Sequence, residues 1–320
     1  MKQFALVLAS CTLTIYLFAQ DSPVVPAFEQ VIALQRPSNA IISPDGKHTL
    51  FTVSSTDWEN NRFDTEIWLS KNDGTPFQLT RTADGSSFSP AWSPDGKYIS
   101  FKAKRGKSTQ IHVIPIQGGE AFPITHEKGN IGGYEWSPNG RQIAFTMQLE
   151  EKDKKRKEKY GAFDEDDAEY RLSWLYTIDF QPNAVVTLPC YDKKDSTAQA
   201  WTCQELPKAD AVIDSVEYTI RNFQWSPNGK TIAFTHTPDP LINSFFNADI
   251  SLVNLEDKTV TSLVKNPSAD FFSDWSPDGK SILYSSDLDN RTSNYYKNGK
   301  NFILDLASGK SRQIAKDFDE

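Results

Sequence analysis

Short runs of alternating apolar and polar residues recur along the chain with the two-residue period of a β-strand. In each run an isoleucine and an aromatic residue stand two positions apart, so both side chains lie on one face of the strand. The four clearest runs are Tyr98–Phe101, Gln142–Phe145, Thr231–Phe234 and Ser281–Tyr284. The pattern predicts many short strands rather than long helices.

A tight-turn motif stands directly before each of these runs. Ser-Pro-Asp/Asn-Gly followed by Lys or Arg begins at Ser43, Ser93, Ser137, Ser226 and Ser276. Proline sets φ at the second position of a turn, Asp or Asn favours the third, and glycine relieves the steric limit at the fourth. Each copy is therefore predicted to be a hairpin turn between two strands.

A large residue precedes the motif in every copy. Tryptophan occupies this place four times and isoleucine once, as Ile42, Trp92, Trp136, Trp225 and Trp275. A tryptophan that recurs at one point of a repeat is expected to pack in the core between neighbouring units rather than to bind a ligand.

Two further strands follow each hairpin. Third strands are expected at Glu66–Leu69, Gln110–Ile114, Trp174–Ile178, Asp249–Val253 and Asn301–Leu304. After a second turn, fourth strands are expected at Phe77–Thr80, Phe122–Thr125, Val260–Leu263 and Arg312–Ile314. Four antiparallel strands per repeat, with a period of about 40 to 50 residues, are typical of a β-propeller blade.

The motif serines are 50, 44, 89 and 50 residues apart. The longest gap allows either one blade with insertions or one additional degenerate blade. We favour insertions, because residues 148–170 are highly charged and residues 189–215 lack the turn motif. The predicted fold is an all-β propeller of four-stranded antiparallel blades. The five recognisable blades are placed at about residues 40–80, 90–125, 134–188 with insertions to 215, 222–264 and 272–315. No spare strand closes the ring, which indicates a fragment of a seven- or eight-bladed propeller.

The first twenty residues differ in composition from the rest. Lys2 precedes an apolar run over residues 4–18, which is typical of a secretory signal peptide and short for a membrane span. We therefore expect a signal peptide at residues 1–20 and a propeller at residues 21–320, exported to the periplasm or the cell exterior. Cys11 stands in a lipoprotein-like box, but the apolar run before it is very short, so lipid anchoring is not expected.

Removal of the signal peptide leaves Cys190 and Cys203. An even number of cysteines in an exported chain favours a disulfide between them, with two free thiols as the alternative. The net charge of −8 disfavours nucleic-acid binding, and no later segment is apolar enough to span a membrane.

The ordered set of motifs resembles the propeller of prolyl-oligopeptidase-family serine peptidases, in particular their acylaminoacyl-peptidase-like bacterial branch. The resemblance covers roughly residues 28–320. It is carried by the segments Arg36–Val53, Ile67–Leu69, Ser89–Lys97, Gly118–Ala121 and Tyr160–Asp166. The repeat alone is also found in the propellers of Tol-Pal systems.

This resemblance implies a non-catalytic domain that restricts peptide access to an α/β-hydrolase domain. The chain has no Gly-x-Ser-x-Gly nucleophile elbow, so no catalytic residue is assigned. The alternative is a stand-alone periplasmic propeller that binds a protein partner, as the Tol-Pal resemblance implies, and a sensor or surface-binding module is a third option. Because blade one begins almost directly after the signal peptide, the peptidase interpretation is favoured.

Few residues are candidates for binding chemistry. The four histidines, His48, His112, His126 and His236, show no metal-ligand spacing, and no cofactor or metal site is expected. His48 and His112 fall in predicted strands and are expected to be hydrogen-bonded structural residues. Glu165 and Asp166, within an acidic cluster, are candidate ligands for the amino terminus of a peptide; a solvated insert that balances the basic run at residues 152–159 is the favoured alternative.

Overall fold

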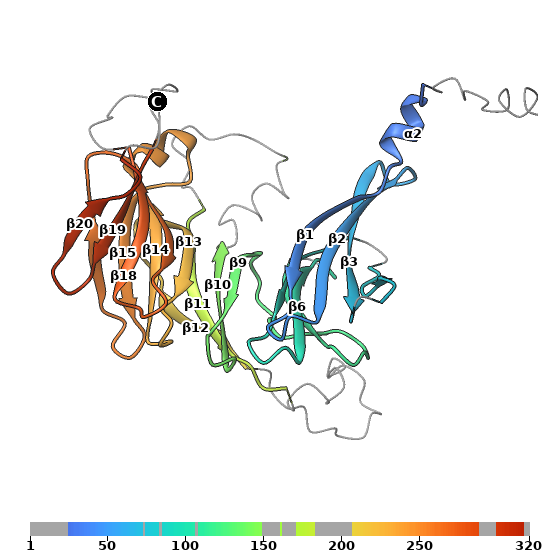
Figure 1. Ribbon diagram of the computed structural model, residues 1–320, viewed down its shortest axis with the longest axis horizontal. Helices are drawn as coiled ribbons and strands as arrows, with labels where there is room; N and C mark the ends of the chain where they lie inside the picture. The colour runs from blue at the N-terminus through green and yellow to red at the C-terminus, as the bar shows by residue number, and fades with distance from the viewer. Residues whose placement is uncertain are drawn as a thin grey trace, which may run out of the picture. The chain divides into compact units, whose positions relative to one another are not determined.

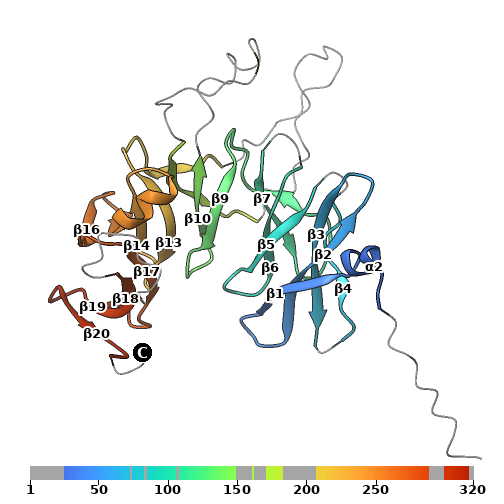
Figure 2. The same ribbon diagram turned by 90° about the horizontal axis from the view of Figure 1, so that it is seen from above.

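The computed structural model describes residues 25–72, 74–82, 85–105, 108–148, 161, 171–182, 207–287 and 299–316. These residues form five four-stranded antiparallel sheets, and within each sheet the strands are hydrogen-bonded in chain order. Figures 1 and 2 show sheets that succeed one another from the blue to the red part of the chain. The predicted all-β fold with five blades is confirmed.

The first two sheets contain strands of very unequal length. The first consists of β1 (Arg36–Ile42), β2 (His48–Asp57), β3 (Arg62–Lys71) and β4 (Phe77–Gln78). The second consists of β5 (Ser87–Trp92), β6 (Tyr98–Ala103), β7 (Gln110–Pro115) and β8 (Phe122–Pro123). In both sheets the fourth strand is the shortest.

The other three sheets repeat this order. The third consists of β9 (Ile131–Trp136), β10 (Gln142–Gln148), β11 (Ser173–Asp179) and β12 (Asp210–Ile213). The fourth consists of β13 (Thr219–Trp225), β14 (Thr231–Thr237), β15 (Asp249–Asn254) and β16 (Val260–Val264), with the 3-10 helix η2 (Ile242–Asn247) between β14 and β15. The fifth consists of β17 (Asp270–Trp275), β18 (Ser281–Ser286), β19 (Lys300–Asp305) and β20 (Lys310–Gln313).

The fourth strand of the third sheet lies where the sequence indicated only an insertion. The strand β12 pairs with β11 through Leu175 and Ile213, and through Tyr176 and Ala211. The sequence places these residues in the insertion that extends to 215, because no turn motif marks them. Pairing with β11, rather than local sequence, makes this segment a strand.

Each turn motif closes the hairpin between the first and second strands of its sheet. Ser93 Oγ donates to Asp95 Oδ1 at 2.7 Å and accepts the main-chain N–H of Tyr98 at 3.0 Å. Gly96 has a φ of +70°, a conformation that glycine adopts without strain. The same serine bonds recur in the other four copies, so all five motifs are hairpin turns as predicted.

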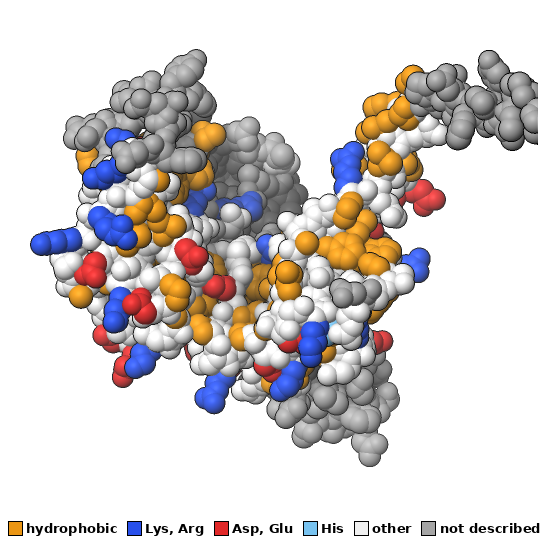
Figure 3. Space-filling view, viewed as in Figure 1, with side chains coloured by type: hydrophobic (Ala, Val, Ile, Leu, Met, Phe, Trp, Pro, Cys, Tyr) orange, Lys and Arg blue, Asp and Glu red, His pale blue; other side chains and the backbone are white. Residues whose placement is uncertain are grey.

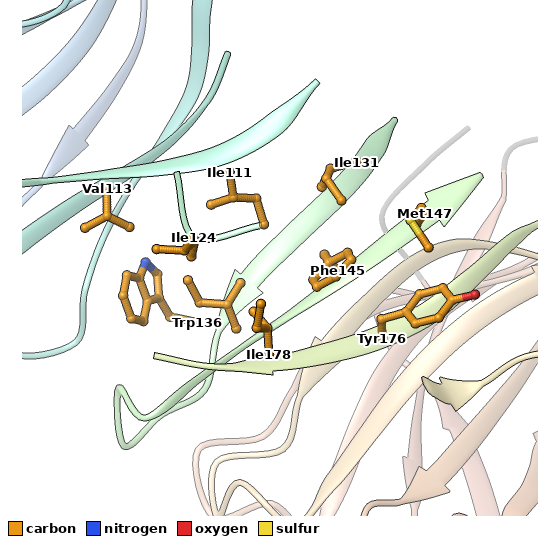
Figure 4. Packing of buried hydrophobic residues seen from close by; sticks show 10 residues of the cluster. Ile111, Val113, Ile124, Ile131, Trp136, Phe145, Met147, Tyr176 and Ile178 are labelled. Carbon is orange, nitrogen blue, oxygen red and sulfur yellow. The ribbon is translucent and has the colours of Figure 1, made fainter. Parts of the chain in front are cut away.

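The core lies between successive sheets. Four clusters of buried apolar residues each combine side chains of one sheet with those of the next. Figure 4 shows one of them, in which Ile111 and Val113 of β7 face Trp136, Phe145 and their neighbours in the third sheet. Complete burial of a side chain such as Phe145 stabilises the fold by about 1.5–3 kcal/mol.

A smaller compact unit comprises residues 1–36 and 54–64, and a larger one comprises residues 37–53 and 65–320. In the described part of the smaller unit, Thr56 Oγ1 at the end of β2 donates to the carbonyl of Ile32 in α2 (Phe28–Ile32) at 2.6 Å. Apolar side chains are gathered over α2 in Figure 3. The exposed ones on and beside this helix are Val25, Phe28, Val31 and Leu34.

Candidate functional site at the first-strand edges

The first strands of neighbouring sheets contact one another, as β9 does with β13 and β13 with β17. They are edge strands of their sheets, and in a propeller such contacting edges line the central channel. The residue before each tryptophan therefore recurs along this inner edge. From the second sheet to the fifth these residues are Ala91, Glu135, Gln224 and Asp274.

Glu135 is the carboxyl group whose pKa is shifted furthest among the described residues. Its Oε2 accepts the main-chain N–H of Trp225 in the next sheet at 2.9 Å. Burial raises the pKa of Glu135 to about 7; the Asp274 carboxylate adds to the rise, and the N–H of Trp225 opposes it. This carboxyl group can therefore take up or release a proton near neutral pH while it links two sheets.

The neighbouring positions on the same edge are polar as well. Asp274 Oδ1 accepts the main-chain N–H of Trp275 at 2.8 Å. Gln224 Oε1 is buried and has no hydrogen-bond partner among the described residues. Sequence reasoning did not select Glu135, although its position before Trp136 in the repeat was a signal that could have found it.

Tyr134 connects the second and third sheets beside Glu135. Its hydroxyl donates to the carbonyl of Ser89 at 2.7 Å and lies 3.1 Å from Ser100 Oγ. Burial raises the pKa of Tyr134, so the phenol stays neutral and acts as a hydrogen-bonding tie.

The histidines of the strands have two different environments. The ring of His112 is buried, stacks on Phe101 with a centroid distance of 5.7 Å, and its Nδ1 lies 3.2 Å from the carbonyl of Gln110. This agrees with the expected structural role. The expectation was wrong for the ring of His48, because its Nδ1 is buried without a hydrogen-bond partner among the described residues.

One serine and one histidine are hydrogen-bonded, a pair that the sequence did not indicate. His236 Nε2 lies 3.0 Å from Ser251 Oγ, and the histidine ring packs on Tyr218 with a centroid distance of 4.4 Å. Burial lowers the pKa of His236 to about 4, and the serine is 3% exposed. A buried hydroxyl beside a weakly basic ring is out of reach of a substrate, so we interpret the pair as a structural bond between β14 and β15.

Several predicted features lie outside the described residues. These are the signal peptide at residues 1–20 with Cys11, the candidate peptide ligands Glu165 and Asp166, and the cysteine pair Cys190 and Cys203. Within the described ranges, no group of three or more His, Cys, Asp or Glu side chains is placed to hold a metal ion. The same ranges contain no helix with the length and apolar character needed to cross a membrane.

The repeated sheets and their contacting inner edges define a β-propeller. The chain is 28% identical over 305 residues to dipeptidyl-peptidase 5 of Porphyromonas gingivalis; the match covers 91% of this chain and 43% of that relative. It is 26% identical over 124 residues, 38% of its length, to the Bacillus subtilis protein named uncharacterized peptidase YuxL, and covers 19% of it. The chain thus spans less than half of these curated relatives. No family model matches it.

Solved structures share the fold. Acylaminoacyl peptidase of Pyrococcus horikoshii matches 90% of this chain with a TM-score of 0.59 at 18% identity, and 40% of that structure is covered. TolB of Acinetobacter baumannii matches 87% with a TM-score of 0.50 at 17% identity, and 53% of it is covered. An oligogalacturonate lyase matches 85% with a TM-score of 0.56, at 14% identity and 63% coverage of that chain. Such different activities on one architecture mean that these matches show the fold alone.

Proposed function

We propose that this chain is the non-catalytic propeller part of an exported serine peptidase, where it limits which peptides reach an α/β-hydrolase domain. The observation that supports this most strongly is the similarity to dipeptidyl-peptidase 5 over 91% of the chain. More than half of that relative lies outside the match, which leaves room for a catalytic domain. Blades arranged around a channel admit an extended peptide and exclude a folded protein.

The proposal is tested with a chimera. The matched part of Porphyromonas gingivalis dipeptidyl-peptidase 5 is replaced by this chain, and kcat/KM is measured for a short peptide and for a folded protein. We expect the chimera to cleave the peptide and to spare the protein. This chain alone is expected to cleave neither, with a serine-directed inhibitor as the control for contamination. Hydrolysis by this chain alone, or a chimera that cleaves folded protein as readily as peptide, contradicts the proposal.

Glu165 and Asp166 remain hypothetical ligands for the amino terminus of the peptide. Two carboxylates that face an ammonium group bind it by charge and hydrogen bonds. In the chimera, Glu165→Gln and Asp166→Asn are then expected to weaken binding of peptides with a free amino terminus and to spare N-blocked ones. Equal losses for both kinds of peptide would assign these residues to a solvated insert.

Export and the redox state of the cysteines follow from the same proposal. Amino-terminal sequencing of the mature protein is expected to place cleavage near residue 20. A mass increase of two hydrogen atoms on reduction is expected for a disulfide between Cys190 and Cys203. Recovery of the uncleaved chain in the cytoplasm contradicts export.

The alternative function is a protein-binding scaffold. It is favoured by 31% identity over 83 residues, 26% of this chain, to the Tol-Pal system protein TolB of Francisella tularensis. This function predicts a complex of defined stoichiometry between the purified chain and a purified periplasmic protein. It also predicts that the chimera has no peptidase activity.

A further inference from the structure

The first strands of four sheets share an irregularity in their pairing with the second strands. Each contains a β-bulge, where one or two residues have no partner across the pair. A bulge turns its extra residue out of the regular alternation of the strand and is common beside binding sites. From the second sheet to the fifth, the unpaired residues are Ser89 and Pro90, Gly132 and Gly133, Arg221, and Ser273. Arg221 is the one charged side chain among these bulge residues.

The guanidinium of Arg221 is held in place by groups of its own sheet. Its Nε donates to Thr237 Oγ1 at 3.0 Å, and its Nη2 donates to the carbonyl of Asp239 at 3.1 Å. Its Cζ lies 4.3 Å from the centroid of the Phe245 ring in η2, at the distance of a cation–π contact. The ring of Phe245 in turn packs on Phe271 of the fifth sheet, with a centroid distance of 6.2 Å. The position of this cation is therefore fixed before any ligand binds.

One edge of the same guanidinium has no protein partner among the described residues. Arginine has five N–H donors, and the bonds to Thr237 and Asp239 use the edge formed by Nε and Nη2. The edge formed by Nη1 and Nη2 remains, and the side chain of Arg221 is partly exposed. Neither ion pair in the described part of the chain involves Arg221. A free Nη1–Nη2 edge has the geometry that binds both oxygens of a carboxylate.

Burial and charge determine which anion suits this position. Burial lowers the pKa of Arg221, and the Asp239 carboxylate, which lies beyond ion-pair distance, opposes the fall. A cation that has lost part of its hydration is stabilised by a bound counter-ion. Because Asp239 already supplies one negative charge nearby, a singly charged carboxylate fits better than a doubly charged phosphate.

Apolar side chains around the guanidinium indicate what else the ligand contains. Leu241 and Ile242, at the start of η2, are 43% and 79% exposed. They belong to the same loop as Phe245, whose ring contacts both Arg221 and Phe271. Exposed apolar side chains beside a directed hydrogen-bonding group are typical of a site for a small ligand. The chemistry therefore suits an apolar residue that carries a carboxylate.

We propose that the free edge of Arg221 binds the carboxyl terminus of a peptide whose last residue is apolar. Both carboxylate oxygens accept hydrogen bonds from Nη1 and Nη2, and the last side chain lies against Phe245 and Ile242. The inference rests on the proposed function and deepens it. Because β13 is an inner-edge strand, a peptide in the channel is held there by its carboxyl end.

The test titrates the full chain with blocked peptides and measures dissociation constants by nuclear magnetic resonance. Acetyl-Ala-Ala-Phe has a free carboxyl terminus, and its carboxamide has none. Acetyl-Ala-Glu-Phe carboxamide offers only a side-chain carboxylate, and inorganic phosphate tests for a general anion site. The peptides all lack a free amino group, so Glu165 and Asp166 do not act on them as amino-terminus ligands.

Two variants of Arg221 and one matched control locate the site. Arg221→Gln removes the charge, Arg221→Lys keeps the charge without the fork, and Arg312→Gln changes an exposed arginine on β20. We expect the wild-type chain to bind the free acid at least about tenfold more tightly than the carboxamide. Arg221→Gln is expected to abolish this preference, Arg221→Lys to retain only part of it, and Arg312→Gln to leave it unchanged.

Equal binding of acid and carboxamide by the wild-type chain, or no binding of either, overturns the proposal without any variant. A preference that survives in Arg221→Gln, or that is lost equally in Arg312→Gln, overturns it as well. Equally tight binding of the glutamate peptide assigns the site to acidic side chains, and tighter binding of phosphate assigns it to anions in general; both results contradict recognition of a carboxyl terminus. No peptide is cleaved in this experiment, so loss of gating in the chimera and loss of carboxylate binding are separate results.

Discussion

Glu135 of the third sheet accepts two hydrogen bonds from Trp225 of the fourth sheet. The carbonyl of Glu135 accepts the indole N–H of Trp225 at 3.3 Å, and its carboxylate accepts the main-chain N–H of the same residue at 2.9 Å. The two residues are 90 positions apart in the chain. The junction between the third and fourth sheets therefore contains a titratable group near the point where two edge strands meet.

The first prediction concerns pH. The pKa of Glu135 is raised from 4.5 to about 7 on folding, so the folded protein favours the protonated carboxyl. The contribution of Glu135 to the free energy of unfolding is therefore fully present below pH 4.5, and it is lost as the pH rises through about 7. Relative to wild type, Glu135→Gln is expected to change the free energy of unfolding little at pH 4.5 and to raise it by about 2–3 kcal/mol at pH 8.

Urea titrations at both pH values measure this difference. Glu120→Gln, at an exposed position, is the matched control and is expected to show no such pH dependence. A Glu135→Gln variant with the same pH profile as wild type would mean that the carboxylate is solvated in the folded protein.

The second prediction concerns the serine of the turn. Ser226 Oγ donates to Asn228 Oδ1 at 2.8 Å and accepts the N–H of Thr231 at 3.1 Å, and the side chain is 1% exposed. Ser226→Ala removes both hydrogen bonds, although Asn228 Oδ1 still accepts the N–H of Lys230 at 2.9 Å, and is expected to lower the free energy of unfolding by about 1–2 kcal/mol in urea titrations. Ser262→Ala, at an exposed position on β16, is expected to stay within about 0.5 kcal/mol of wild type. Equal effects of the two changes would contradict a structural role for the turn serine.

The third prediction compares two adjacent glycines of β9. A Cβ on Gly132 would lie 2.5 Å from Thr146 Oγ1, which is itself held by the N–H of Gly133. A Cβ on Gly133 would have its nearest neighbour at 3.7 Å, in ordinary contact with Phe223. In thermal unfolding, Gly132→Ala is expected to cost about 1–3 kcal/mol, and Gly133→Ala to be neutral or stabilising by up to about 1 kcal/mol. The reverse order would show that the strand shifts to accommodate the methyl group.

The fourth prediction concerns the indole of Trp136. Its Nε1 donates to Ser100 Oγ at 2.8 Å, while its ring meets Phe180 edge to face at a centroid distance of 4.8 Å. Trp136→Phe keeps an aromatic ring and removes the donor. A double-mutant cycle with Ser100→Ala is expected to give a coupling energy of about 0.5–1.5 kcal/mol. A coupling energy of zero would indicate that packing alone fixes the tryptophan.

The sequence by itself determined the hairpins, the number of strands in four of the five sheets and the blade repeat. These features depend on a few consecutive residues, because proline and glycine set the turn and two-residue alternation sets the strand. The Ser93 turn and the strand Tyr98–Phe101 could therefore be predicted without knowledge of any partner. The recurring tryptophan was likewise enough to predict a buried junction.

Only the tertiary structure decided which residues have shifted pKa values, which pair through their side chains and which polar atoms are buried without a partner among the described residues. The strand β12 exists because β11 offers it a partner, and the raised pKa of Glu135 comes from burial beside Trp225 and Asp274. The contact of His236 with Ser251 and the unpartnered Nδ1 of His48 depend on neighbouring strands in the same way. Burial and hydrogen bonding are set by groups far apart in the chain, so a local pattern predicts where a side chain stands but not what surrounds it.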